Sequence, residues 1–108
     1  MARIPLTDDS GKWFDSSKAS RFHNRTRWNG RNNISLSAGE HNQHILYRTA
    51  SGRWVLNFSS QWANERETYS EITDKEAAQW FVINEYENEE IPQDLLPLVK
   101  PFIDDMEV

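Results

Sequence analysis

The chain has 108 residues and a net charge of -5, with five Trp, five Phe, three Tyr and no Cys. This length suits one hydrophobic core, so we expect residues 1–108 to form a single domain. The lack of Cys excludes disulfides, thiolate metal sites and a Cys nucleophile. No apolar run approaches the roughly 18 residues of a membrane span, and Met1–Ser10 lacks a signal-peptide pattern. We therefore expect a cytoplasmic protein with no membrane partner.

The charges are unevenly distributed along the chain. Residues 16–39 contain five basic side chains and no acid, whereas residues 65–108 contain thirteen acids and three bases. The basic residues are Lys18, Arg21, Arg25, Arg27 and Arg31. The two halves can attract each other within the fold or be simply solvated, or they can provide a basic surface for nucleic acid and an acidic surface for a basic partner.

The first part of the chain predicts short elements. Arg3–Thr7 reads as an edge strand, because its proline cannot donate to a ladder. Residues 8–11 follow as a turn. Asp15 offers a helix N-cap, and we expect a single helical turn within Lys18–His23, with Phe22 as its inward residue.

The strongest pattern is a β-hairpin over residues 44–59, the central element of the predicted sheet. Two alternating runs flank Ser51-Gly52, which reads as a two-residue turn. This turn pairs Thr49 with Trp54, Tyr47 with Leu56, and Ile45 with Phe58. We expect these six side chains to form one apolar face that packs on a helix.

A capped helix is predicted over Thr73–Tyr86. Thr73 and Glu76 have the spacing of a capping box. The apolar face of this helix is wider than a contact with the sheet alone requires. We expect part of it to contact either a short helical tail that opens at Ile91-Pro92 or a second copy of the chain. The sequence thus predicts an α+β fold: an antiparallel sheet of three to five strands with a central hairpin, packed by a C-terminal helix and a short helical tail.

Five strings carry a resemblance. They are Trp28-x-Gly30-x-Asn32-x-Ile34-Ser35, Leu46-Tyr47-Arg48-Thr49, Ser51-Gly52-Arg53-Trp54-Val55-Leu56, Ser60-Gln61-Trp62 and Ala77-Ala78-x-Trp80. With these strings the chain resembles a set of small bacterial proteins of unknown function. The resemblance implies a bacterial origin and one self-contained domain, and it assigns no catalytic or binding residue.

Two histidines form the only candidate metal motif. Glu40-His41-x-x-His44 could chelate Zn²⁺ or Ni²⁺ if His23 or an acid supplied a third ligand. Residues three apart on a strand point to opposite faces, so the pair converges only if the chain turns between them. We read these residues as a polar loop before a strand, and we expect no metal and no cofactor.

Nucleic-acid chemistry is the alternative function. The basic residues from Lys18 to Arg31 alternate with Phe22 and Trp28, a mixture that suits backbone contacts and base stacking. A metal-independent ribonuclease would add a base such as His23 and use these arginines or Arg48 to stabilise the phosphorane. The other candidate bases are His41 and His44. The pI of about 5.1 disfavours RNA affinity, and half-buried rings covered by arginines would give the same pattern.

The remaining interpretation is binding without catalysis. The chain has no phosphate-binding loop and no nucleophile elbow, so we assign no catalytic residue. Glu85, Glu89 and Glu90 form the expected partner-binding surface, in a protein-interaction or regulatory module of a bacterial or mobile-element system. The partner is an unknown protein, and a homodimer is a second candidate assembly.

Overall fold

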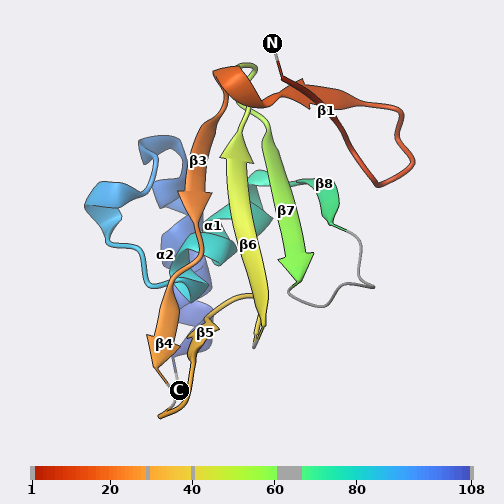
Figure 1. The fold of residues 1–108 in the computed structure, drawn as a ribbon. Coiled ribbons are helices and arrows are strands. Elements are labelled where there is room, and N and C mark those ends of the chain that lie inside the picture. The colour runs from red at the N-terminus through yellow and green to blue at the C-terminus, as the bar shows by residue number, and fades with distance from the viewer. Residues whose placement is uncertain (1, 29, 40, 61–66, 108) are drawn as a thin grey trace.

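A four-stranded antiparallel sheet forms the centre of the computed structural model, which describes residues 2–28, 30–39, 41–60 and 67–107. Its strand order is β3-β6-β7-β8. The strands are β3 (Ser20–His23), β6 (Asn42–Arg48), β7 (Trp54–Ser60) and β8 (Thr68–Ile72). Helices α1 (Asp74–Ile83) and α2 (Leu96–Met106) lie together on one face of the sheet (Figure 1). The α+β fold expected from the sequence is confirmed.

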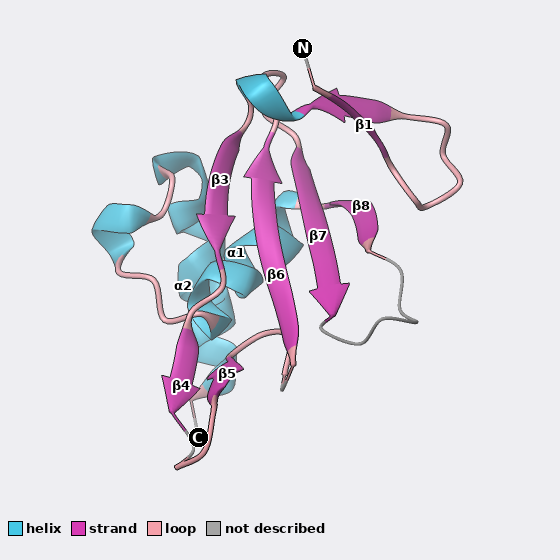
Figure 2. Cartoon of the chain, in the orientation of Figure 1, coloured by secondary structure: helices cyan, strands magenta, loops and turns pink. Residues whose placement is uncertain are grey.

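Two smaller antiparallel hairpins flank this sheet (Figure 2). One joins β1 (Arg3–Pro5) to β2 (Trp13–Asp15), and the other joins β4 (Thr26–Trp28) to β5 (Asn33–Ser35). Three 3-10 helices complete the described part of the chain: η1 (Ser16–Lys18), η2 (Asn88–Glu90) and η3 (Gln93–Leu95). No helix among the described residues is long and apolar enough to cross a membrane.

The helical turn expected within Lys18–His23 is wrong for most of that segment. Asp15 caps η1 by accepting a hydrogen bond from the Ser17 amide, but the helix ends at Lys18. After Ala19, the residues Ser20–His23 form β3, which pairs antiparallel with β6. Pairing with β6 satisfies the β3 backbone groups that face β6, and Phe22 still reaches the core between the sheet and the helices.

The central hairpin exists, but its register differs by one residue from the expected one. The Thr49 amide donates to the Arg53 carbonyl at 2.8 Å, and the Gly52 amide donates to the Thr49 carbonyl at 2.9 Å. Gly52 has φ +85°. A turn closed by a left-handed glycine makes a three-residue loop. The expected two-residue turn is therefore wrong.

The corrected register moves one strand's side chains to the other face of the sheet. Leu46 pairs with Leu56, and Tyr47 pairs with Val55 rather than with Leu56. Leu46 therefore joins Trp54 in the core under the helices, while Tyr47 and Val55 form a second core on the opposite face. Trp54 and Val55 are 1% and 2% exposed, so this sheet is covered on both sides.

The two cores have different partners. The larger core lies between the sheet and the helices and contains Leu46, Trp54, Ala77, Ala78, Trp80, Phe81, Ile91, Leu95 and Val99. The smaller core combines Tyr47 and Val55 with Phe14 from β2. The rings of Phe14 and Tyr47 lie 5.1 Å apart, centroid to centroid. The N-terminal hairpin thus covers the sheet face that the helices leave open.

The expected capping box of α1 is confirmed. Thr73 Oγ1 accepts from the Glu76 amide at 3.1 Å, and Glu76 Oε1 accepts from the Thr73 amide at 3.1 Å. The tail is longer than expected, since α2 has 11 residues. Pro97 lies in its first turn, where the missing amide costs no helical hydrogen bond.

Phe81 should carry a large share of the stability. Its ring is 0% exposed and packs edge-on against Phe22, with centroids 4.9 Å apart, and against Trp54, at 5.7 Å. We expect Phe81→Ala to lower the free energy of unfolding by about 3–5 kcal/mol, measured in urea by tryptophan fluorescence.

Ile83 on the same helix is the matched control, because its side chain is 46% exposed. Ile83→Ala should change the free energy of unfolding by less than about 1 kcal/mol. Equal losses in the two variants would contradict this description of the core.

Candidate functional site

Two of the predicted basic residues are bound to two of the predicted acidic ones. Arg25 reaches Glu90 at 2.7 Å, and Arg27 reaches Glu85 at 2.6 Å. Hydrogen bonds that the Arg25 guanidinium donates to Tyr86 and Glu90 raise the pKa of Arg25, and the Glu87 amide together with Arg25 lowers the pKa of Glu90. The asymmetric halves of the sequence therefore attract each other across the fold at these positions.

The remaining predicted site residues do not gather on one surface. Lys18 belongs to η1 at one end of the sheet, while β4 with Arg27 lies at the other end (Figure 1). Arg21 lies on β3, 5.8 Å from the Tyr47 ring centroid. Arg31 and Glu89 lie in exposed segments, the β4–β5 turn and η2.

His44 belongs to a polar junction between the sheet and α1. Its Nδ1 lies 2.8 Å from Ser37 Oγ and 3.4 Å from the Trp80 indole nitrogen. Asn84, at the end of α1, is 0% exposed, and its Oδ1 accepts a hydrogen bond from the Arg25 amide at 2.9 Å. Among the residues that the structure describes, no three His, Asp or Glu side chains form a metal site, and Glu40 of the proposed motif lies outside them.

The junction should make stability depend on pH. Burial lowers the pKa of His44, so the unfolded chain takes up this proton first as the pH falls. The stabilisation by neutral His44 is present above about pH 6.5, the ordinary histidine value, and is lost as the pH falls toward the lower folded-state pKa.

Chemical denaturation between pH 5 and 7 tests this dependence. We expect the free energy of unfolding to rise with pH in the wild type and to rise less in His44→Asn. The carboxyls whose pKa values are lowered, such as Asp15 and Asp94, titrate below this window. An unchanged slope in His44→Asn would contradict the prediction.

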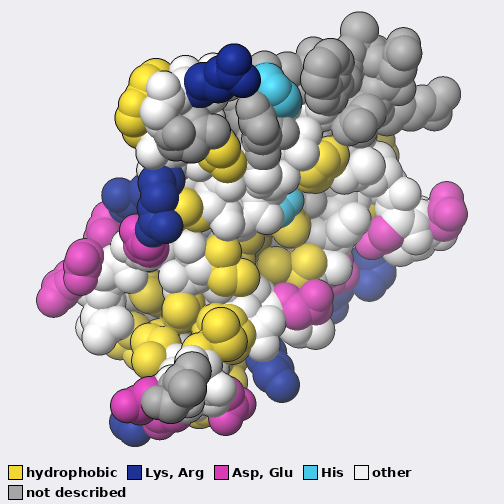
Figure 3. All heavy atoms as spheres, turned by 90° about the horizontal axis from the view of Figure 1, so that it is seen from below, with side chains coloured by type: hydrophobic (Ala, Val, Ile, Leu, Met, Phe, Trp, Pro, Cys, Tyr) yellow, Lys and Arg dark blue, Asp and Glu magenta, His cyan; other side chains and the backbone are white. Residues whose placement is uncertain are grey.

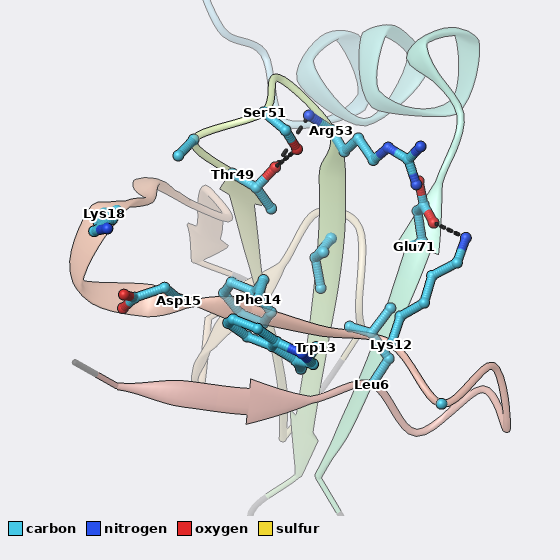
Figure 4. Close-up of a pocket in the computed structure, with 13 residues that line it drawn as sticks. Leu6, Lys12, Trp13, Phe14, Asp15, Lys18, Thr49, Ser51, Arg53 and Glu71 are labelled. Atoms are coloured by element: carbon cyan, nitrogen blue, oxygen red, sulfur yellow. Dashed lines mark hydrogen bonds and ion pairs between the residues drawn. The ribbon is translucent and has the colours of Figure 1, made fainter.

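A larger site lies where the N-terminal hairpin crosses the sheet (Figure 4). Here a cavity of about 700 Å³ opens between β2 and the turn of the β6–β7 hairpin. We call it the hairpin hollow. Its apolar lining is Leu6, Trp13, Phe14, Ala50 and Val55, its charged lining is Lys12, Asp15, Lys18, Arg53 and Glu71, and Gly11, Thr49 and Ser51 complete it.

Cations outnumber acids around the hairpin hollow. Glu71 is shared by Lys12 at 3.4 Å and Arg53 at 3.5 Å, and both cationic side chains are more than half exposed. Lys18 forms no ion pair with any described residue. Hydrogen bonds from the hydroxyl and amide of Ser17 lower the pKa of Asp15, which keeps its carboxylate ionised.

Sequence reasoning missed this hollow. Lys12 and Arg53 are forty-one positions apart in the sequence, and only the docking of the N-terminal hairpin on the sheet brings them together. The available signal in the sequence was the adjacent pair of rings, Trp13 and Phe14. In the structure Phe14 is buried, at 5% exposure, and Trp13 is half exposed, at 50%.

A second hollow lies between the two helices and is almost entirely apolar. It measures about 410 Å³ and is lined by Val82, Ile83, Phe102, Ile103, Met106 and Glu107. Ile103 is 47% exposed and Met106 is 67% exposed. Seen from below, hydrophobic side chains gather on this face of the molecule, and both acidic and basic side chains lie at its margins (Figure 3). We call this surface the α1–α2 groove.

Comparison with protein-family models, curated proteins and solved structures finds no match for this chain. The resemblance to small bacterial proteins of unknown function stays a prediction.

Proposed function

We propose that this chain is a non-catalytic protein-interaction or regulatory module of a bacterial or mobile-element system, acting in the cytoplasm. The observation that carries the proposal is the hairpin hollow. It combines an apolar floor at Phe14 and Val55 with an exposed cationic rim at Lys18 and Arg53. An apolar floor with a few charged groups at its rim is the arrangement of binding sites.

The titratable groups support binding rather than proton transfer. No His lines the hairpin hollow. Asp15 has a lowered pKa, and a carboxyl that stays ionised at neutral pH is a poor general acid. His44 belongs to the junction with Ser37 and Trp80, and neither of the two hollows includes it.

The ion pairs also disfavour nucleic-acid binding through the basic segment. Arg25 and Arg27 are held by Glu90 and Glu85, so a phosphate would have to displace a carboxylate at each. The same pairs affect the proposed acidic surface, where Glu89 is the residue without a described ion pair. Glu89 is therefore the better probe of that surface than Glu85 or Glu90.

Charge reversal at the hollow tests the proposal. We expect the double variant Lys18→Glu/Arg53→Glu to fold as the wild type does and to lose a cross-linked protein partner identified in lysate of the source bacterium. Lys100→Glu is the control, because that side chain is 81% exposed on α2 and lies outside the hollow.

Three results would count against this assignment. Retention of the partner by the double variant would remove the hollow as the binding site. Loss of the partner in Glu89→Lys alone would move binding to the acidic surface. Tight RNA or DNA binding that weakens steeply with salt would replace the proposal with nucleic-acid recognition.

The α1–α2 groove supports the homodimer as a second assembly. Trp80 is buried, but Ile83 on the same helix is 46% exposed beside Ile103 and Met106. Apolar surface of this kind is often covered by another subunit. We expect sedimentation at micromolar concentrations to show a dimer that Ile103→Lys abolishes and Lys100→Glu retains. A strict monomer in the wild type would remove the argument.

A further inference from the structure

We propose that the hairpin hollow receives an extended acidic segment of the partner, which adds to the N-terminal hairpin as a third strand alongside β2. This inference rests on the proposed function and names the chemistry of its ligand. Strand addition requires an unpaired strand edge, and specificity then comes from alternate side chains of the added strand.

The outer edge of β2 carries unpaired backbone groups. In an antiparallel pair, residues alternate between those bonded to the neighbour and those whose backbone points outward. Two hydrogen bonds fix the alternation here: Leu6 amide to Lys12 carbonyl at 2.9 Å, and Ser16 amide to Ala2 carbonyl at 2.9 Å. The amide and carbonyl of Trp13 and the amide of Asp15 therefore point away from β1, and no described group bonds to them.

This free edge borders the hairpin hollow. Figure 4 shows the strand containing Trp13 and Phe14 between β1 on one side and the hollow on the other. The lining confirms the placement, since it includes Trp13, Phe14 and Asp15 from β2 and no residue of β1. A strand added at this edge would therefore lie across the hollow.

Other strand edges are partly protected. On β8, the Tyr69 amide and carbonyl bond to Thr7 at 2.8 and 2.7 Å. On β3, the His23 carbonyl accepts a hydrogen bond from the Tyr86 hydroxyl at 2.7 Å. On β1, Pro5 has no amide to donate. Bonding and proline are two ways in which native proteins protect edges, and the outward backbone groups of Trp13 on β2 have neither. The outward backbone groups of Arg21 on β3 also have no described bond, but no residue of β3 lines the hollow.

The side chains around this edge define the ligand. Phe14 and Lys12 share the face of β2 that looks toward the sheet, because alternate residues share a face. Phe14 is 5% exposed within the smaller core, and Lys12 reaches Glu71 on β8. Lys12 precedes β2 and Lys18 follows it. The edge thus has an apolar centre and a cation near each end.

An acidic strand fits this arrangement. Every second residue of the added strand would face the hollow, in the order Glu, apolar, Glu. The apolar side chain would lie over Phe14 and Val55, and the two carboxylates would lie toward Lys12 and Lys18. Arg53, 60% exposed at the rim, adds a third cation. Lys12 and Arg53 share the single carboxylate of Glu71, unlike Arg25 and Arg27, which have one glutamate each, so the cations here exceed their partner by one in addition to Lys18. Lysines beside an edge can also serve only to repel other strands, so the experiment must separate attraction from protection.

A synthetic peptide of this pattern is the probe: acetyl-Thr-Glu-Thr-Leu-Thr-Glu-Thr-amide, titrated into the full chain labelled with ¹⁵N. We expect saturable binding, with shifts and slowed hydrogen exchange at the amides of Trp13 and Asp15. The peptide with Lys in place of both Glu should bind at least roughly tenfold more weakly, as should the wild-type peptide to Lys18→Glu/Arg53→Glu. The Lys100→Glu variant should bind the peptide unchanged.

Backbone methylation tests the added strand itself. Alternate amides of a strand point to opposite edges, so one peptide carries N-methyl groups on its Glu and Leu residues and another carries them on its inner Thr residues. We expect one methylated peptide to lose binding and the other to retain it. Equal binding by both methylated peptides would overturn strand addition. The hollow would then recognise the side chains of the peptide without pairing its backbone.

The outcomes separate this inference from the proposed function. If the acidic peptide does not bind but Lys18→Glu/Arg53→Glu loses the partner, the acidic strand is overturned. The hollow then remains the site of protein interaction. If the peptide does not bind and that variant retains the partner, both the acidic strand and the hollow as an interaction site are overturned. The lysines then serve to protect the edge. Preference for the Lys peptide would also overturn the inference.

Discussion

The register of the β6–β7 hairpin is the constraint on which the rest of the structure depends. Gly52, in its left-handed conformation, closes a three-residue loop and thereby pairs Leu46 with Leu56. A shift of one residue would move a whole strand's side chains to the opposite face. With the observed register, Leu46 meets the helices and Tyr47 meets Phe14. The hairpin hollow exists because Tyr47 and Val55 give the N-terminal hairpin a place to dock.

Local patterns were readable from the sequence and nonlocal ones were not. The capping box at Thr73 and Glu76 involves residues three apart, so its chemistry is visible in the sequence string. The hairpin was visible from its alternation, but the number of residues in its turn depends on one backbone conformation, that of Gly52. The pairing of Arg25 with Glu90 joins positions 65 apart and follows only from the assembled fold.

The charge asymmetry illustrates the same distinction for function. The run of five cations allows either a basic surface or attraction to the acidic half. The fold distributes these residues over both ends of the sheet and pairs two of them with glutamates. Exposed ion pairs contribute little stability, typically up to about 1 kcal/mol each. Their effect here is to reduce the charge available to a partner, whereas Lys18 keeps its charge unpaired among the described residues.

The arrangement of the strands also has a consequence for the order in which the chain folds. Strands β6, β7 and β8 and helix α1 are neighbours both in the sequence and in space, so their contacts close short loops at low entropic cost. The β1–β2 hairpin and β3 precede them in the chain but attach to surfaces that this central unit provides. During synthesis the β1–β2 hairpin and β3 must therefore wait, unpaired with the sheet, until the residues up to Ser60 have followed.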